Sequence, residues 1–169
     1  MMKKSIDLEL TQEEKHLIKT KKISQKLLAN CAMDEVITIL NANAERAKTL
    51  KGLFEFQSIP SIGIKFAKDL MLLGYYDLAS LKDKSGPELL NDYEKHIGKW
   101  TDPCVEDQFW LVVHYANYFD SKKKWWDFTS QRKAFRSQFG YPSDRPTNAW
   151  FENAKGAAFF KSKELQELI

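Results

Sequence analysis

The sequence predicts an all-α fold, and three kinds of observation support this prediction. Apolar residues recur at intervals of three or four, as in Phe66, Leu70 and Leu73, which is the spacing of one helix face. Helix-start signals also recur. The strongest runs from Ser85 to Glu88, with a capping serine, a first-turn proline and a glutamate three residues after the cap. No stretch alternates apolar and polar residues as a half-buried strand does.

Taken in chain order, these signals predict helices in the following places: after the capping box Thr11 to Glu14, over 33–40, 44–54, 64–73 and 86–97, in a single turn near Leu78 and Leu81, after Asp102, and around Arg132. Residues 1–10 are expected to be loosely ordered. Residues 164–169 are expected to form a short helix capped by Ser162.

The chain is organised around residues 57–70, where one predicted helix ends, Pro60 bends the backbone, and another helix begins after Gly63. The turn from Ile59 to Gly63 resembles that of the helix-hairpin-helix motif, which reads apolar-Pro-Gly-apolar-Gly. In that motif the amides of the turn open onto the start of the second helix, where a phosphate can be held. Gly63 is expected to adopt a conformation that other residues avoid.

Ser61 stands where the motif has its first glycine. Serine keeps the backbone amide but adopts a positive φ at a higher cost than glycine does. A hairpin that only packs the domain, without binding phosphate, is therefore the alternative interpretation of this turn.

The length of 169 residues predicts one domain with appendages. We expect an N-terminal helical extension over 1–30, a helix-hairpin-helix domain over 31–139, and a C-terminal loop with short helices over 140–169. The overall architecture is thus a compact helical domain built around the hairpin, with short helical extensions at both ends.

The net charge of +3 is too small to indicate a polyanionic partner by itself, but the charges are unevenly distributed. Residues 1–50 carry 9 basic and 7 acidic side chains (+2), residues 51–120 carry 7 and 11 (−4), and residues 121–169 carry 10 and 5 (+5). A nucleic-acid surface would have to combine the hairpin with the basic final third.

A set of short blocks is similar to the bacterial pathogenicity-locus family: Ile59 to Gly63, Leu81, Asp102-Pro103-Cys104-Val105 with Asp107, Trp125-Trp126-Asp127-Phe128-Thr129, and Arg132-Lys133. Members of this family are small helix-hairpin-helix proteins, sometimes labelled mitomycin resistance proteins. The resemblance covers residues 45–136. It implies an all-α fold and DNA binding, but no established reaction. A role in DNA repair or stress resistance is predicted together with the DNA binding.

The predicted function is therefore binding of duplex DNA with little sequence preference. The residues expected to contact DNA are the hairpin residues Ser61, Ile62 and Gly63, the adjacent Lys65 and Lys68, and the downstream Lys122, Lys123, Lys124, Arg132 and Lys133. The lysine loop precedes Trp125 and Trp126, which either form a stacking platform for unpaired bases or anchor the core. We expect at least one of these tryptophans to lie in the core.

Three other interpretations remain open. The predicted helices over 33–40 and 44–54, with the turn 41–43 between them, also fit a helix-turn-helix whose second helix would present Arg46, Lys48 and Lys51 outward. The chain also fits a protein–protein interaction module that does not bind DNA. In helix-hairpin-helix glycosylases with lyase activity, a lysine sits two residues after the second glycine, and here Lys65 and the downstream Asp83 occupy comparable positions.

Cys104 lies in the first turn of a predicted helix, where a thiolate is favoured, but its distance along the chain from His96 and His114 matches no ligand or nucleophile pattern. We expect a binding protein rather than an enzyme, with no catalytic residues, no metal site and no cofactor.

Two cysteines make no disulfide framework, and no signal peptide or membrane-length apolar run is seen, so a cytoplasmic protein is expected. A homodimer or a protein partner would supply a second grip on DNA.

Overall fold

The computed structural model describes residues 6–152, and over these residues the protein is helical, as the sequence predicts. A single isolated bridge, between Trp100 and Ala149, is the one β-type pairing in this range. The helices are α1 (Gln12–Thr20), α2 (Gln25–Asn30), α3 (Met33–Leu40), α4 (Ala44–Ser58), α5 (Ile64–Leu72), η1 (Ala79–Leu81), α6 (Gly86–Ile97), α7 (Pro103–Tyr118), η2 (Trp125–Phe128) and α8 (Thr129–Phe139), where η marks a 3₁₀ helix.

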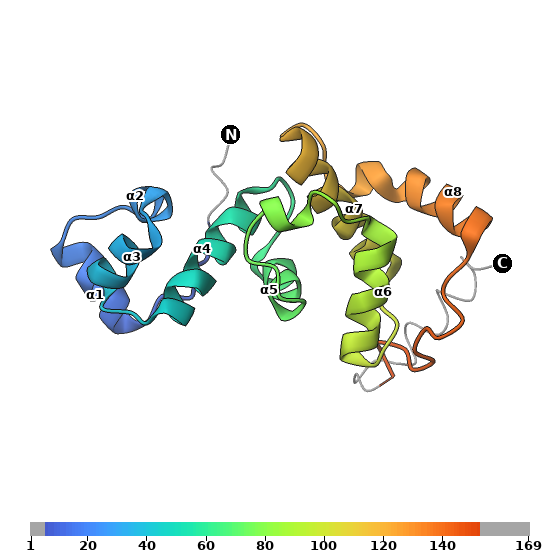
Figure 1. Cartoon of the computed structure of the whole chain (residues 1–169), viewed down its shortest axis with the longest axis horizontal. Coiled ribbons are helices and arrows are strands. Elements are labelled where there is room, and N and C mark those ends of the chain that lie inside the picture. Colours follow the sequence, from blue (N-terminus) through green and yellow to red (C-terminus); the bar gives the residue numbers. More distant parts are fainter. Residues whose placement is uncertain (1–5, 153–169) are drawn as a thin grey trace.

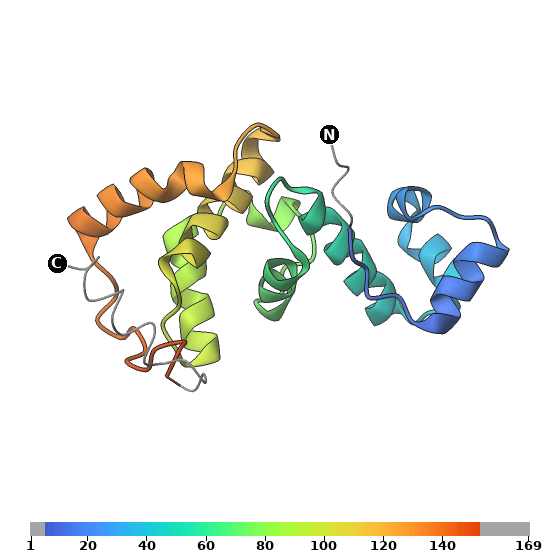
Figure 2. The same cartoon turned by 180° about the vertical axis from the view of Figure 1, so that it is seen from behind.

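The helices follow one another along the long axis of the molecule (Figures 1 and 2). Helices α1, α2 and α3 gather around the first half of α4 and form what we call the N-terminal unit. The second half of α4 reaches the middle of the molecule, where the chain turns into α5. Helices α5 to α8, with the segment 140–152, form the C-terminal unit. None of the described helices is long and apolar enough to cross a membrane.

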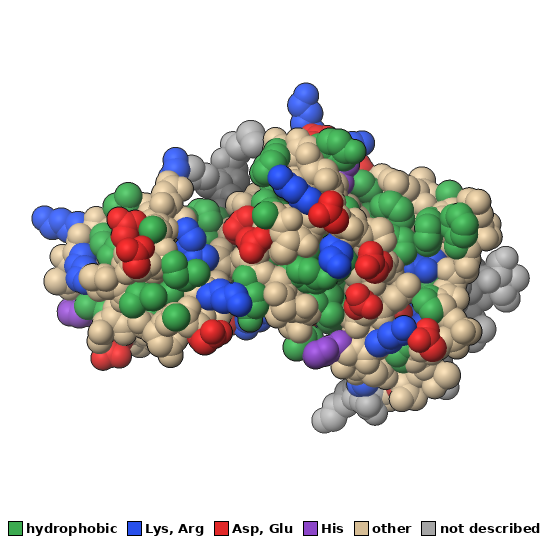
Figure 3. All heavy atoms as spheres, viewed as in Figure 1, with side chains coloured by type: hydrophobic (Ala, Val, Ile, Leu, Met, Phe, Trp, Pro, Cys, Tyr) green, Lys and Arg blue, Asp and Glu red, His purple; other side chains and the backbone are tan. Residues whose placement is uncertain are grey.

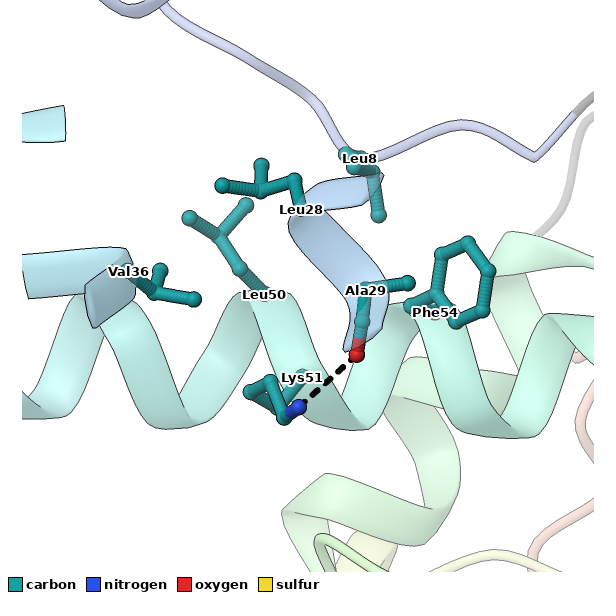
Figure 4. A pocket seen from close by; sticks show the side chains of 7 residues that line it. All are labelled: Leu8, Leu28, Ala29, Val36, Leu50, Lys51 and Phe54. Atoms are coloured by element: carbon teal, nitrogen blue, oxygen red, sulfur yellow. Dashed lines mark hydrogen bonds between the residues drawn. The ribbon is translucent and has the colours of Figure 1, made fainter. Parts of the chain in front are cut away.

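In the N-terminal unit the hydrophobic core includes Leu8, Leu28, Val36 and Leu50 (Figure 4). A void of about 10 Å³ remains among these side chains. The ammonium group of Lys51 closes one side of it by donating to the backbone carbonyls of Ala29 (2.8 Å) and Cys31 (2.7 Å) at the end of α2. These contacts satisfy carbonyl groups that the end of a helix leaves without a partner.

The segment before α1 is held in place by tertiary contacts, so the expectation that residues 1–10 are loosely ordered is wrong for residues 6–10. Leu8 is 2% exposed. The amide of Asp7 donates to Gln57 Oε1 (3.0 Å), and Gln57 Nε2 donates back to the carbonyl of Asp7 (2.6 Å). No local pattern marks this segment, because its partners lie 50 residues away in α4.

Capping residues begin the helices where the sequence predicts them. Thr11 accepts from the amide of Glu14, and the Glu14 carboxylate accepts from the amide of Thr11, which completes the capping box. Ser85 caps α6, and Gly98 ends it in a left-handed conformation at φ 68°. Asp102 caps α7 through the amide of Cys104.

The core of the C-terminal unit centres on Phe109 of α7. Its ring lies 4.8 Å from that of Phe66 on α5 and 5.8 Å from that of Tyr93 on α6. Gly86 allows α6 to approach α7 closely, because a Cβ atom there would lie 2.7 Å from Cγ of Trp110. The hydrophobic core therefore joins α5, α6 and α7 into one body.

After α8 the chain turns back along the molecule through residues 140–152. Gly140 ends α8 at φ 68°. The amide of Trp100 then donates to the carbonyl of Asn148 (2.9 Å), and the amide of Trp150 donates to the carbonyl of Trp100 (2.9 Å). The short helix expected over 164–169, with Ser162 as its cap, lies outside the described residues.

Candidate nucleic-acid interface

The turn between α4 and α5, residues 59–63, has the left-handed residue that the sequence pattern requires, but at an unexpected position. Ser61 lies at φ 61°, the conformation that the motif usually supplies with a glycine. Gly63 lies at φ −97°, an extended conformation open to any residue, so the expectation for Gly63 is wrong. A left-handed serine costs about 1–2 kcal/mol relative to its ordinary conformation. The surrounding packing holds the turn in this shape.

Several amides at the start of α5 have no acceptor. Within the described part of the chain, no group accepts from the amides of Gly63, Ile64 or Lys65, and α5 lacks a side-chain cap. Gly63 is exposed, and a Cβ atom there would meet nothing within 4 Å. Open amides at a helix start carry a partial positive charge and suit an anion such as a phosphate.

The amide of Ile62 is already engaged, because it donates to the carbonyl of Ile59 (3.3 Å). We therefore leave Ile62 out of the candidate surface and include Ile64, which sequence reasoning missed. The signal that could have found Ile64 is the rule that the first turn of any helix leaves its amides unbonded.

The two lysines next to the turn differ. Lys65 is exposed at the start of α5. Lys68 forms a surface ion pair with Glu9 (2.5 Å) from the segment before α1. Such exposed pairs contribute about 0–1 kcal/mol to stability, but Glu9 offsets the charge of Lys68 toward an anion.

A hydrogen bond links the α4–α5 turn to the lysine loop, which comprises Lys122, Lys123 and Lys124. The amide of Trp125, the first residue after the loop, donates to Ser61 Oγ (3.2 Å). These two residues are 64 positions apart in the sequence. The hydroxyl that replaces the expected glycine thus holds the loop beside the turn.

The lysine loop has a fixed shape. The amide of Lys122 donates to Asp120 Oδ1 (2.9 Å), and the amide of Lys124 donates to Asp127 Oδ2 (2.8 Å). The first of these bonds is the largest of the causes that lower the pKa of Asp120. Lys122 and Lys123 remain exposed, so their ammonium groups are accessible to a ligand.

Exposed aromatic rings flank the lysine loop. Trp125 is partly buried against the core, as expected for one of the two tryptophans, whereas Trp126 is 54% exposed. Tyr118 and Phe119, at the end of α7, are 72% and 61% exposed. Sequence reasoning missed these two, although the sequence shows a pair of aromatics separated from the lysine run only by Asp120 and Ser121.

Arg132 and Lys133 differ in their surroundings. Arg132 Nε lies 2.7 Å from Asp107 Oδ1, and the side chain of Arg132 is only 10% exposed. Thr129 Oγ1 donates to the other oxygen of Asp107 (2.8 Å). Arg132 is therefore committed to an internal ion pair, and we leave it out of the candidate surface. Lys133 is exposed on α8.

Every arginine of the chain, like Arg132, forms an ion pair with a buried carboxylate. The chain has four, and each pairs with a carboxylate that the structure buries: Arg46 with Glu14, Arg132 with Asp107, Arg136 with Glu106, and Arg145 with Glu94. The planar guanidinium group suits this task, because it presents a fork of donors to both carboxylate oxygens. The arginines of the basic final third thus neutralise the acidic middle of the chain, and lysines make up the exposed basic surface beside the turn.

The helix-turn-helix interpretation loses two of its three cations to internal contacts, because Arg46 and Lys51 bind other parts of the chain and only Lys48 is exposed. Arg46 Nε and Nη2 each lie 2.8 Å from an oxygen of Glu14. Lys48 Nζ lies 4.1 Å from the centre of the Tyr76 ring, and Lys51 binds the end of α2. Arg46 and Lys51 thus stabilise the N-terminal unit, and Lys48 contacts a residue that follows α5.

Neither candidate nucleophile has the surroundings that its reaction needs. Burial, together with a hydrogen bond that the thiol donates to the Asp102 carboxylate, raises the pKa of the Cys104 thiol to about 11, so little thiolate forms near neutral pH. Lys65 and Asp83 are both exposed, and a lysine nucleophile requires desolvation. Among residues 6–152, no group of three or more His, Cys, Asp or Glu side chains is arranged to hold a metal ion.

A scan against protein-family models matches residues 49–134 to the family Cdd1, described as "Pathogenicity locus". The chain belongs to this family. The matched region runs from the middle of α4 into α8 and includes the turn, the lysine loop and the Asp107–Arg132 pair. Helices α1 to α3 lie outside it. Neither a search of the curated proteins nor a search of the solved structures found a match.

Proposed function

We propose that this protein binds duplex DNA with little sequence preference, and that α4, the turn and α5 act as a helix-hairpin-helix. In this proposal the amides of Gly63, Ile64 and Lys65 hold one phosphate at the start of α5. Backbone contacts of this kind position a protein on DNA without reading bases, which is why no sequence preference is expected.

The observation that carries the proposal is the hydrogen bond from the amide of Trp125 to Ser61 Oγ. Through it, the exposed Lys122 and Lys123 lie on the same part of the molecule as the open amides and Lys65. A second phosphate on the same backbone would meet the lysine loop. Two sets of contacts that follow one backbone are typical of nonspecific binding.

The proposal implies a cytoplasmic protein with access to bacterial DNA, in repair or in resistance to DNA damage. A single turn of this kind binds one DNA strand weakly, so a second copy of the chain or another protein would supply a second binding site and raise the overall affinity.

A protein-interaction module is the second candidate, and the exposed aromatic rings favour it. Tyr118, Phe119 and Trp126 are residue types enriched at protein interfaces. A module of this kind would show no steep dependence on salt toward DNA, so one titration separates the two candidates.

The test compares two charge reversals of equal size in the full chain. The double variant Lys65→Glu, Lys122→Glu alters the candidate surface, and Lys15→Glu, Lys19→Glu alters exposed lysines of α1. Binding to a fluorescent blunt duplex is followed by anisotropy at several salt concentrations. We expect the first variant to bind more weakly and to lose about 0.9 from the slope of log K against log salt for each phosphate contact removed.

The control should keep the slope of the unaltered protein, since its charges lie on the N-terminal unit. Equal weakening by both variants would show that only net charge matters and would overturn the assigned surface. Absence of any binding at low salt would overturn the DNA-binding proposal itself.

A further inference from the structure

The end of α7 and helix η2 form a corner where three large aromatic side chains stand in solvent around three lysines. The rings belong to Tyr118, Phe119 and Trp126, and we call this set the aromatic corner. Figure 3 shows hydrophobic and basic side chains next to each other on this part of the surface, at the top of the view. Within the described residues four aromatic side chains are strongly exposed, and three of them are at this corner; the fourth is Phe139 at the far end of α8.

Each ring of the aromatic corner leans on a more buried ring. Trp126 meets Trp125 edge to face, with centroids 5.3 Å apart at an interplanar angle of 82°. Phe119 lies 5.8 Å from Tyr115, and Tyr118 lies 4.9 Å from His114. Rings that are braced on one side and open on the other lose little conformational freedom when a flat ligand stacks on them.

Phe119 also adopts an unusual backbone conformation. It lies at φ 51°, the left-handed position that ends a helix and that glycine usually occupies. A bulky side chain at such a position is an outlier, and its ring is exposed rather than packed into the core. The backbone conformation by itself would favour a glycine here, whereas a surface that binds planar groups favours the exposed phenylalanine ring.

We infer that the aromatic corner stacks unpaired bases, so that the preferred ligand is a DNA duplex carrying a single-stranded tail. This inference rests on the proposed function. Lysines interleaved with open aromatic rings are the combination that tracks a phosphate backbone while successive bases stack. The bond from Trp125 to Ser61 places the corner beside the open amides of α5. A duplex phosphate held at α5 would leave an adjoining single strand within reach of Trp126.

The test uses the full chain and three fluorescent DNA probes: a blunt duplex, the same duplex with a short thymidine tail, and the same duplex with a tail of abasic sites. The abasic tail retains the phosphates and lacks the bases. We expect the thymidine tail to improve affinity about fivefold or more over the blunt duplex, the lower end of what stacking one base contributes. The abasic tail should give little of this preference.

Three variants sharpen the measurement. Trp126→Ala should bring the ratio of tailed to blunt affinity close to one, and Trp126→Phe should keep most of the preference because a ring remains. Phe139→Ala, which removes an exposed ring away from the corner, should leave the ratio unchanged.

The outcomes separate the inference from the function on which it rests. Blunt-duplex binding without a preference for the thymidine tail would overturn the inference and leave the proposed function standing. A preference that survives in the abasic tail, or in Trp126→Ala, would also overturn it. If no probe binds at low salt, the proposed function falls and the inference with it.

Discussion

Two basic regions of this molecule use their positive charges in opposite ways. In the C-terminal unit, Arg132, Arg136 and Arg145 lie against carboxylates on α6 and α7 that are fully buried. At the corner beside the α4–α5 turn, Lys65, Lys122 and Lys123 stand in water. The comparison teaches that the basic final third of the sequence is in large part an internal structural feature, and that the surface available to an anion is smaller and made of lysine.

Tyr141 shows how closely the arginine region is packed. Its ring lies 3.6 Å from the guanidinium carbon of Arg145 and 4.2 Å from that of Arg136. The flat guanidinium groups stack on the ring while their nitrogens bind Glu94 and Glu106. A lysine could not do both, because its ammonium group is a compact, strongly hydrated point charge.

The largest expected effect comes from breaking one of the buried pairs. Arg136→Ala leaves the Glu106 carboxylate buried without its partner, and we expect a loss of about 3–5 kcal/mol in the free energy of unfolding. Urea unfolding followed by circular dichroism measures this loss. Lys133→Ala, an exposed cation on the same helix, should change it by less than about 0.5 kcal/mol. Similar losses in both variants would erase the distinction between the two regions.

A smaller effect is expected at Phe119, where fold and proposed binding call for different residues. Phe119→Gly removes the backbone strain of a phenylalanine in the left-handed conformation. We therefore expect the free energy of unfolding to rise by about 1 kcal/mol in the variant. The same variant should bind tailed DNA less well. A thermal melt and the tailed-duplex titration measure the two results. A clear loss of stability would show that the ring supports the fold.

The smallest effect concerns pH and contrasts the N-terminal unit with the C-terminal unit. The hydrogen bond from Arg46 holds the pKa of Glu14 below its usual value of 4.5, so the stability that this pair contributes is present above that pH and is lost as pH falls through the lowered value. Burial raises the pKa of Glu106 despite its bond to Arg136, so the contribution of Glu106 is present below pH 4.5 and is lost as pH rises through the raised value.

Acid should therefore weaken the Glu14 pair first. Glu14→Gln is expected to flatten the fall of the urea midpoint below about pH 4.5. The neighbouring exposed Glu13 supplies the control, because Glu13→Gln should leave this acid limb as it is. An acid limb of unchanged steepness in Glu14→Gln would contradict the role assigned to the Arg46 pair.

Local signals predicted the helices well because their causes are local. The caps at Thr11, Ser85 and Asp102 act within three residues, and the structure has a helix start at each. The bend at Pro60 likewise follows from the proline ring itself. Sequence signals also predicted the all-α class and the burial of one of the two tryptophans, which is Trp125.

The sequence did not show which cations have partners far along the chain. Lys68 pairs with Glu9 and Arg132 with Asp107, at separations of 59 and 25 residues. Nothing in the sequence distinguishes these cations from Lys65 or Lys133. Residues 6–10 looked unstructured for the same reason, since the contacts of Asp7 with Gln57 span 50 residues.

The sequence by itself determined most of the helix starts, because capping and apolar spacing act over a few residues; it did not predict α2 and placed the end of α4 too early. Only the tertiary structure decided which positive charges face water. An arginine opposite a buried carboxylate is drawn inward to compensate the desolvated charge, and a lysine without such a partner stays hydrated. It also decided that the serine of the α4–α5 turn, left-handed where a glycine was expected, would hold the lysine loop beside the open amides of α5.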